Sequence, residues 1–220
     1  SRSDNGIVWG QPTGKVSGFK PKDLVGIPWR FAIAAQDSGW YLRADIIWHK
    51  GNPMPESVTD RPTKSHEYIF LLTKSKKYHY NAKAIGEPMK EVSLKRAFSE
   101  NHLDIRKDVI AGGNIYAIGI ESQEVHFEKI REAIKNGEEL LRNRRSVWKI
   151  NTHSVREAHF ATFPEKIPEL CIMAGCPDKG TVLDPFLGSG TTGRVAERLG
   201  RKWIGIEMNP EYIEIAKRRT

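Results

Sequence analysis

Apolar residues recur along the chain with two different periods, and together these periods predict a protein of mixed α/β structure. Helical spacing is seen from Pro21 to Gly39, from Glu165 to Ala174, between the glycines at 193 and 200, and after Asn209-Pro210. Short apolar runs of strand length separate these helices. The runs cover residues 41–48, 67–73, 146–150, 181–183 and 203–206.

Two long stretches interrupt this rhythm. Residues 51–66 contain three prolines, which exclude regular structure, and so long a loop in a compact domain is often functional. Residues 83–150 are highly charged and are typical of an insertion, with one helix expected from Ser122 to Arg142. A short return strand is expected at Tyr78–Tyr80, while residues 1–20 predict a loop or frayed end.

Residues 180–212 hold the most specific pattern, a strand, a glycine turn, a helix, a second strand and an acid. The turn, Gly188 to Gly193, has the form Gly-x-Gly-x-x-Gly, and the acid is Glu207. Glycines let the backbone turn sharply and approach a ligand, and the N–H groups opening the helix face the ligand. The acid can accept hydrogen bonds from a ribose diol. The pattern favours a nucleotide-type ligand over a glycine-rich turn in an ordinary α/β domain.

Composition narrows the class of protein without identifying it. The 220 residues are 39% hydrophobic and 28% charged, which suits one domain, or one domain with an insertion. No apolar run approaches the roughly 20 residues of a membrane span. The net charge of +8 suits a polyanionic partner, and the alternative is a merely basic soluble surface. Cys171 and Cys176 are expected to be reduced residues of the core, in keeping with a cytosolic protein.

The string Asp184-Pro-Phe-Leu-Gly-Ser-Gly-Thr-Thr192 resembles the cofactor motif of amino-group DNA methyltransferases, which modify adenine at N6 or cytosine at N4. This family uses S-adenosylmethionine. Ile204-Gly-Ile-Glu207, followed by Asn209-Pro210, resembles the second cofactor motif, in which the acid binds the ribose. HFATFP at 159–164 stands at the family's entry to its first helix, with Phe160 and Phe163 in place of the usual Pro and Lys.

The order of the motifs resembles the beta class of the family, in which the catalytic half precedes the cofactor half. The resemblance implies a doubly wound, mostly parallel sheet of the methyltransferase type in circularly permuted order, with an inserted target-recognition segment. The expected parts are a catalytic half at 1–82, the recognition insertion at 83–150 and the cofactor half at 151–220.

The family's catalytic motif, Asp- or Ser-Pro-Pro-Tyr, is the main departure. No Pro-Pro-aromatic string occurs in the 220 residues, so no catalytic residue is assigned and the motif is expected upstream of Ser1. Such enzymes flip the target base out of the duplex before methyl transfer. They need acceptors for the amine protons and alignment with the sulfonium methyl rather than a covalent nucleophile or a metal. The seven His residues show no metal-ligand spacing.

The resemblance and the charge pattern together nominate two sets of site residues. The expected cofactor contacts are Asp184, Phe186, Gly188, Ser189, Gly190, Thr191, Thr192, Glu207 and His159. The expected DNA contacts are Arg142, Arg144, Arg145, Lys74, Lys76, Lys77, Asn52 and Arg61. Asp184 could instead cap a turn, and Phe186 could belong to the core. The basic residues could equally form a solvated face, and the 51–66 loop could be a rigid structural loop.

The implied partner is double-stranded DNA, with no membrane association. The chain is also expected to form a homodimer or to associate with a missing amino-terminal part. The enzyme is expected to be cytoplasmic, bacterial or phage-encoded, and part of a restriction-modification system. Two alternatives stay open. One is a non-catalytic DNA-binding or specificity partner that retains the fold. The other is a nicotinamide-dependent oxidoreductase, which shares the glycine pattern and the acid.

Overall fold

The computed structural model describes residues 19–89, 128, 130–138, 140–152 and 163–220. The chain divides into two compact units. One comprises Ser1–Ala44 with Phe70–Lys76, and the other comprises Asp45–Ile69 with Lys77–Thr220. Each unit is described by itself, and the second holds the glycine turn.

The first unit contains helix α1, Ile27–Asp37, which begins later than the expected start at Pro21. Gly26 precedes it with φ of 69°, a left-handed conformation that cannot continue into a right-handed helix. Trp29 of α1 contacts Phe70 edge-to-face, with ring centroids 5.1 Å apart. Ala32 is fully buried, whereas Phe31 and Ile33 are exposed.

Strands β1 (Tyr41–His49) and β2 (His66–Thr73) confirm the strands predicted there. β1 lies between β2 and β5 (Val147–Lys149) in a three-stranded sheet, and β1 and β5 run parallel over residues 47–49 and 147–149. The indole N–H of Trp48 donates to the carbonyl of Ile150 at 2.8 Å. This bond holds the carboxyl ends of the two parallel strands together.

Two predicted elements of the middle of the chain are wrong. Residues 78–80 are irregular instead of a strand. The helix expected to reach Arg142 ends near residue 135, because Gly137 is left-handed with φ of 71° and stops it. Leu141–Arg142 form strand β4 instead, which pairs antiparallel with β3, Glu87–Pro88. The beginning of the expected helix, at 122–127, lies outside the described residues.

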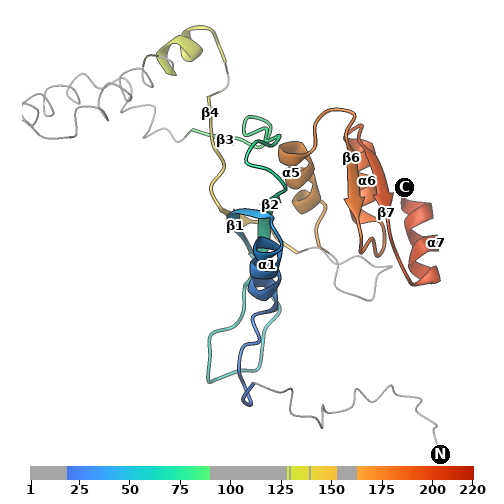
Figure 1. Cartoon of the computed structure of the whole chain (residues 1–220). Coiled ribbons are helices and arrows are strands. Elements are labelled where there is room, and N and C mark those ends of the chain that lie inside the picture. Colours follow the sequence, from blue (N-terminus) through green and yellow to red (C-terminus); the bar gives the residue numbers. More distant parts are fainter. Residues whose placement is uncertain (1–18, 90–127, 129, 139, 153–162) are drawn as a thin grey trace, which may run out of the picture. The chain divides into compact units, whose positions relative to one another are not determined.

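The carboxyl-terminal part of the second unit follows the predicted pattern closely. It consists of α5 (Lys166–Gly175), β6 (Thr181–Asp184), α6 (Thr191–Arg198), β7 (Lys202–Gly205) and α7 (Pro210–Arg219). β6 and β7 pair in parallel through four residues, with α6 as their connection (Figure 1). A helical crossover of this kind is the usual connection between neighbouring parallel strands.

Apolar side chains of α5 join two hydrophobic clusters of the second unit. Leu170 and Ala174 pack with Ile85 and Trp148, next to the carboxyl-terminal half of β1. Ile172, on the other side of the helix, packs with Val195 and Ala196 of α6, which also contact Val182 and Trp203 of the strands. The α5 helix therefore joins the βαβ unit to the sheet that contains β1 and β5.

The described strands form three sheets, of three, two and two strands, instead of the single sheet expected. The parallel pairs β1/β5 and β6/β7 agree with the α/β class. One face of the β6/β7 pair is covered by α6, while Leu183 and Ile204 on the strands are 59% and 56% exposed. Among the described residues, no helix has both the length and the apolar character needed to cross a membrane.

Candidate cofactor site

The glycine turn begins directly where β6 ends. The carboxylate of Asp184 accepts a hydrogen bond from the amide of Phe186 at 2.9 Å, so Asp184 does cap the turn. The amide of Leu187 donates to the carbonyl of Ile206 at 2.9 Å, and the amide of Gly190 donates to the carbonyl of Leu187 at 3.1 Å. These bonds fold residues 184–190 over the carboxyl ends of β6 and β7, where ligands bind in open α/β sheets.

The glycines of this region serve different purposes. Gly188 and Gly190 have φ of 54° and 85°, which other residues adopt only with strain. A side chain at Gly188 would meet only the carbonyl oxygen of Phe186, at 3.9 Å, so the backbone there is open to a ligand. By contrast, a Cβ at Gly193 would lie 3.0 Å from the ring of Trp203, which makes Gly193 a packing residue.

Glu207 follows β7 and holds the turn from the other strand. Its two carboxylate oxygens accept hydrogen bonds from the amides of Gly188 and Asn209, each at 2.8 Å. These amide bonds, Asn209 first, keep the pKa of Glu207 below its ordinary value, so the side chain is ionised at neutral pH. Each oxygen of an ionised carboxylate has a second lone pair, which remains for a hydroxyl donor.

The first turn of α6 presents amide groups next to this carboxylate. Gly190 is the residue before the helix, and the amide of Arg194 is the first to bond back, to the carbonyl of Gly190 at 3.0 Å. The amides of residues 191–193 are therefore the free N–H groups that every helix start leaves. Thr191 is buried, whereas Thr192 is only half-buried.

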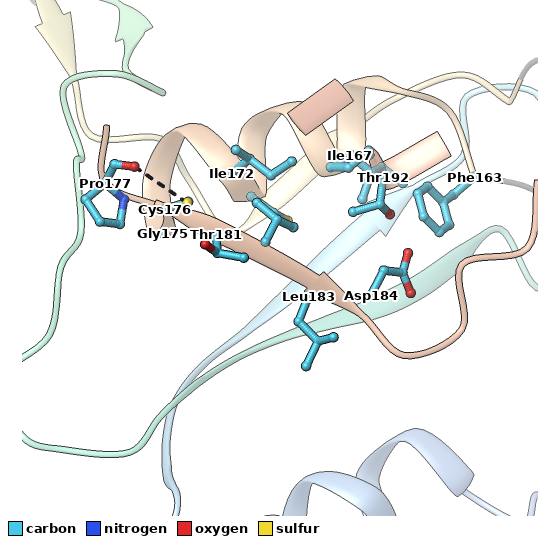
Figure 2. Close-up of a pocket in the computed structure, with 13 residues that line it drawn as sticks. Phe163, Ile167, Ile172, Gly175, Cys176, Pro177, Thr181, Leu183, Asp184 and Thr192 are labelled. Atoms are coloured by element: carbon cyan, nitrogen blue, oxygen red, sulfur yellow. Dashed lines mark hydrogen bonds between the residues drawn. The ribbon is translucent and has the colours of Figure 1, made fainter. Parts of the chain in front are cut away.

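A cavity of about 470 Å³ lies between α5 and β6. Asp184, Thr192 and Phe163 line one end of it (Figure 2). The apolar side chains of α5 line the remainder, while Leu183 points away from α5. The polar end of the cavity thus adjoins the glycine turn, and its walls are largely apolar, as in most small-molecule sites.

Two further predicted cofactor residues differ in how the structure places them. Phe186 is 87% exposed, so the alternative that it belongs to the core is wrong. Its ring stands in solvent beside the turn and is available to cover a flat apolar ligand. His159 lies outside the described residues.

Cys171 is free, and burial raises the pKa of its thiol to about 11, which makes it unsuited to act as a nucleophile.

Several of the predicted DNA contacts take part in internal bonds. Arg142 and Arg144 both pair with Glu87, at 3.1 and 3.4 Å, and Arg144 also donates to the carbonyl of Ile85. These two guanidinium groups hold the β3/β4 pair, so their geometry is that of structural residues. Arg145 is exposed, and its side chain lies outside this cluster.

The other predicted DNA contacts lie within the 51–66 loop or directly after β2. Asn52 exchanges two hydrogen bonds with the backbone of Thr152, at 2.8 and 3.1 Å. Arg61 pairs with Glu56 at 2.7 Å, within the loop. Lys74 lies over the ring of Trp40, 5.1 Å from its centroid, whereas Lys76 is exposed and Lys77 has a partner.

The structure also reveals contacts that the pattern of residues did not predict. Arg219, at the end of α7, donates to the side chain and the carbonyl of Ser189 in the glycine turn. Asn52 and Thr152 are one hundred positions apart. Such pairs carry no local sequence signal, because only the packing of distant elements brings them together. Among the described residues, no cluster of His, Cys, Asp or Glu could hold a metal ion.

The chain as a whole is similar to proteins of a known family. A family model described as DNA methylase matches residues 3–218. Over 202 residues, the chain is 44% identical to the Type II methyltransferase M.SmaI of Serratia marcescens. This match covers 92% of this chain and 54% of that protein. The corresponding values for M.Cfr9I of Citrobacter freundii are 45%, 92% and 52%. The chain thus spans about half the length of the curated relatives it matches.

Solved structures agree at the level of the fold. The M1.HpyAVI-SAM complex matches with a TM-score of 0.55 at 23% identity, over 90% of this chain and 71% of that one. The PvuII DNA methyltransferase, described as cytosine-N4-specific, matches with a TM-score of 0.57 at 21% identity, over 87% and 56%. Because the family model spans almost the whole chain, the conclusion is direct: this chain belongs to the DNA methylase family.

Proposed function

We propose that this chain carries the S-adenosylmethionine site and the target-recognition segment of a DNA methyltransferase. The reaction is transfer of a methyl group to the exocyclic amine of adenine or cytosine in duplex DNA, after base flipping. One observation carries the proposal, namely the ionised Glu207 bonded to an open glycine turn beside the free amides of α6. The match to the DNA methylase family favours methyl transfer over nicotinamide chemistry.

The residues present fit the proposed cofactor. Glu207 has lone pairs left for a ribose diol, and the open backbone at Gly188 lets a ligand approach closely. Phe186 can cover one face of an adenine ring. Asp184 and Thr192, which line the polar end of the cavity, and the free amides at the start of α6 complete the proposed contacts. The bound cofactor supplies an electrophilic methyl group on a sulfonium.

The chain's own contribution to the chemistry is binding and orientation. The α6 amides and the positive end of its dipole attract the carboxylate of an amino acid moiety. The largely apolar wall of the adjoining cavity lowers the polarity beside Asp184 and Thr192, and hydrogen bonds are stronger in such surroundings. Acceptors for the protons of the target amine are not assigned, because the 220 residues contain no Pro-Pro-aromatic string.

The circularly permuted order and the recognition role of residues 83–150 belong to the same proposal. The order rests on the position of the cofactor motif, 184–192, after the strands of the other half. Phosphate contacts are proposed mainly for Arg145 and Lys76, which are exposed. A cytoplasmic, bacterial or phage-encoded setting is also proposed, supported by the bacterial sources of the relatives.

Association with a second polypeptide is proposed as well, either an amino-terminal part of the enzyme or another copy of this chain. Its support is the exposed apolar face of the β6/β7 pair, where Leu183, Ile204 and Ile206 are all more than half exposed. Sheets of the doubly wound class are covered on both faces, because their strands are apolar on both sides.

Substitution of Glu207 tests the cofactor site. The Glu207→Ala chain should bind S-adenosylmethionine at least about tenfold more weakly, since it loses hydrogen bonds to a charged group. Isothermal titration calorimetry measures the affinity. Glu214→Ala is the matched control, because Glu214 is an exposed acid of α7 that pairs only locally with Lys217. Equal affinity of the Glu207→Ala and wild-type chains would refute the assigned ribose contact.

A further inference from the structure

The last turn of α7 is bonded to the glycine turn. One guanidinium nitrogen of Arg219, Nη1, donates to the Ser189 hydroxyl oxygen at 2.7 Å and to the Ser189 carbonyl oxygen at 3.1 Å. Ser189 is only 6% exposed, so its side chain faces the protein interior and its hydroxyl is held there. Hydrogen bonds from a charged donor in such a setting are stronger than neutral ones.

A second contact places α7 against the neighbouring residue of the turn. Gly190 is left-handed with φ of 85°, and a Cβ built on it would lie 2.9 Å from the Cβ of Ala216. Ala216 is buried, and it lies three residues before Arg219, on the same face of α7. The helix therefore touches two consecutive residues of the turn, one by close packing and one by hydrogen bonds.

These contacts determine the orientation of one peptide group. The carbonyl of Ser189 and the amide of Gly190 belong to the same planar unit. Arg219 holds the carbonyl, while the amide donates to the carbonyl of Leu187 at 3.1 Å. With both ends of the peptide fixed, the start of α6 and the direction of its free amides are fixed as well.

We propose that Arg219 is a positioning residue for the cofactor turn. Acting through Ser189, it keeps the turn in the conformation that aims the first amides of α6 and the open backbone of Gly188 at the cofactor. The role rests on the proposed S-adenosylmethionine site and adds a residue that does not itself touch the cofactor. Ser189 then contributes to binding through its backbone, with its hydroxyl as the anchor for Arg219.

A double-mutant cycle measured on cofactor affinity tests this role. Arg219→Ala and Ser189→Ala should each weaken S-adenosylmethionine binding by about tenfold, the change expected when a charge-assisted hydrogen bond is lost. The double variant should bind about as weakly as the Arg219→Ala chain, because Arg219→Ala already removes the bond to the Ser189 hydroxyl. Arg219→Lys should recover part of the affinity, since one nitrogen makes both bonds in the native chain.

Arg218→Ala is the matched control. Arg218 is exposed on the same turn of α7, and within the described part of the chain it bonds to the carbonyl of Glu214 in its own helix. Its substitution should leave the affinity unchanged. Thermal unfolding of each variant, with and without S-adenosylmethionine, shows whether the chains are folded at the temperature of the titration.

Three outcomes would overturn the inference, and they are distinguishable. If the wild-type chain binds no S-adenosylmethionine, the proposed cofactor site is wrong and the positioning role fails with it. If the wild type binds but the folded Arg219→Ala and Ser189→Ala chains bind as tightly as the wild type, only the positioning role is wrong. Fully additive effects of the two alanine substitutions would show that Arg219 acts on affinity by a route other than Ser189.

Discussion

Individual residues of the glycine turn combine structural and binding roles. Asp184 caps the backbone of the turn with one carboxylate oxygen. Glu207 accepts hydrogen bonds from the amide of Gly188, which follows β6, and from the amide of Asn209, which follows β7. Acids placed in this way arrange the turn before any ligand arrives, and a preorganised site loses less entropy on binding. The same carboxylates can therefore stabilise the fold and accept hydrogen bonds from a cofactor.

The ionisation of Glu207 predicts a pH dependence of stability. Its pKa is lower in the folded chain than in the unfolded chain, where it is about 4.3. The contribution of Glu207 to stability is therefore complete above the unfolded pKa and is lost as the pH falls through the folded pKa. Urea unfolding of the wild type and of Glu207→Gln between about pH 3 and pH 7 measures it.

The difference in unfolding free energy between the two chains isolates Glu207 from the other acids. That difference should grow as the pH rises through the acid range and become constant near neutral pH. A difference that does not change with pH would contradict the role assigned to the amide bonds of Gly188 and Asn209.

At the level of elements, short structures near the strand ends hold the polar residues in place. The β3/β4 pair is held by Glu87 between Arg142 and Arg144, so two arginines of a cluster that resembles a basic patch in the sequence take part in internal ion pairs. The 51–66 loop is tied to the end of β5 by the side chain of Asn52. A residue's charge or position alone therefore does not reveal whether it faces DNA.

This distinction predicts different effects for two neighbouring arginines. Arg145→Ala should weaken binding to duplex DNA and reduce the salt dependence of log K by about one, the change expected when one phosphate contact is lost. Arg144→Ala should instead lower the thermal unfolding temperature, because it leaves Glu87 and the carbonyl of Ile85 with fewer donors.

Fluorescence anisotropy with a labelled duplex, repeated over a series of salt concentrations, measures both variants. A full salt slope in Arg145→Ala would remove Arg145 from the proposed DNA contacts. A reduced slope in Arg144→Ala, with no loss of stability, would return Arg144 to them.

At the level of the whole molecule, the chain contains the proposed cofactor site, and no Pro-Pro-aromatic string occurs in its 220 residues. The purified 220-residue chain should therefore bind S-adenosylmethionine but transfer no methyl group to DNA. Incubation with radiolabelled S-adenosylmethionine and DNA of mixed sequence measures transfer, with a full-length relative as the positive control. Incorporated label would refute the expectation, and mass spectrometry of the nucleosides would then distinguish N6-methyladenine from N4-methylcytosine.

The sequence alone predicted most of what is local. The strands at 41–48 and 67–73, the helix near 165–174 and the whole βαβ unit were recognised from periodicity, prolines and glycines, because short-range patterns determine such elements. The glycine motif and Glu207 could be assigned to a nucleotide-type site for the same reason, since they occupy fixed positions within one supersecondary unit. The family resemblance agrees with the later match to the DNA methylase model.

Tertiary structure decided which polar residues are committed to internal bonds. Arg219 and Ser189, Asn52 and Thr152, and Arg144 and Glu87 are each separated by at least thirty positions, and nothing local links them. The helix near 122–142 was overextended because its apolar spacing continues past Gly137, where the backbone turns left-handed. The spacing of apolar residues and the local composition indicate which residues can form a helix or a strand. The partner of a charged side chain depends instead on the distant element that packs beside it.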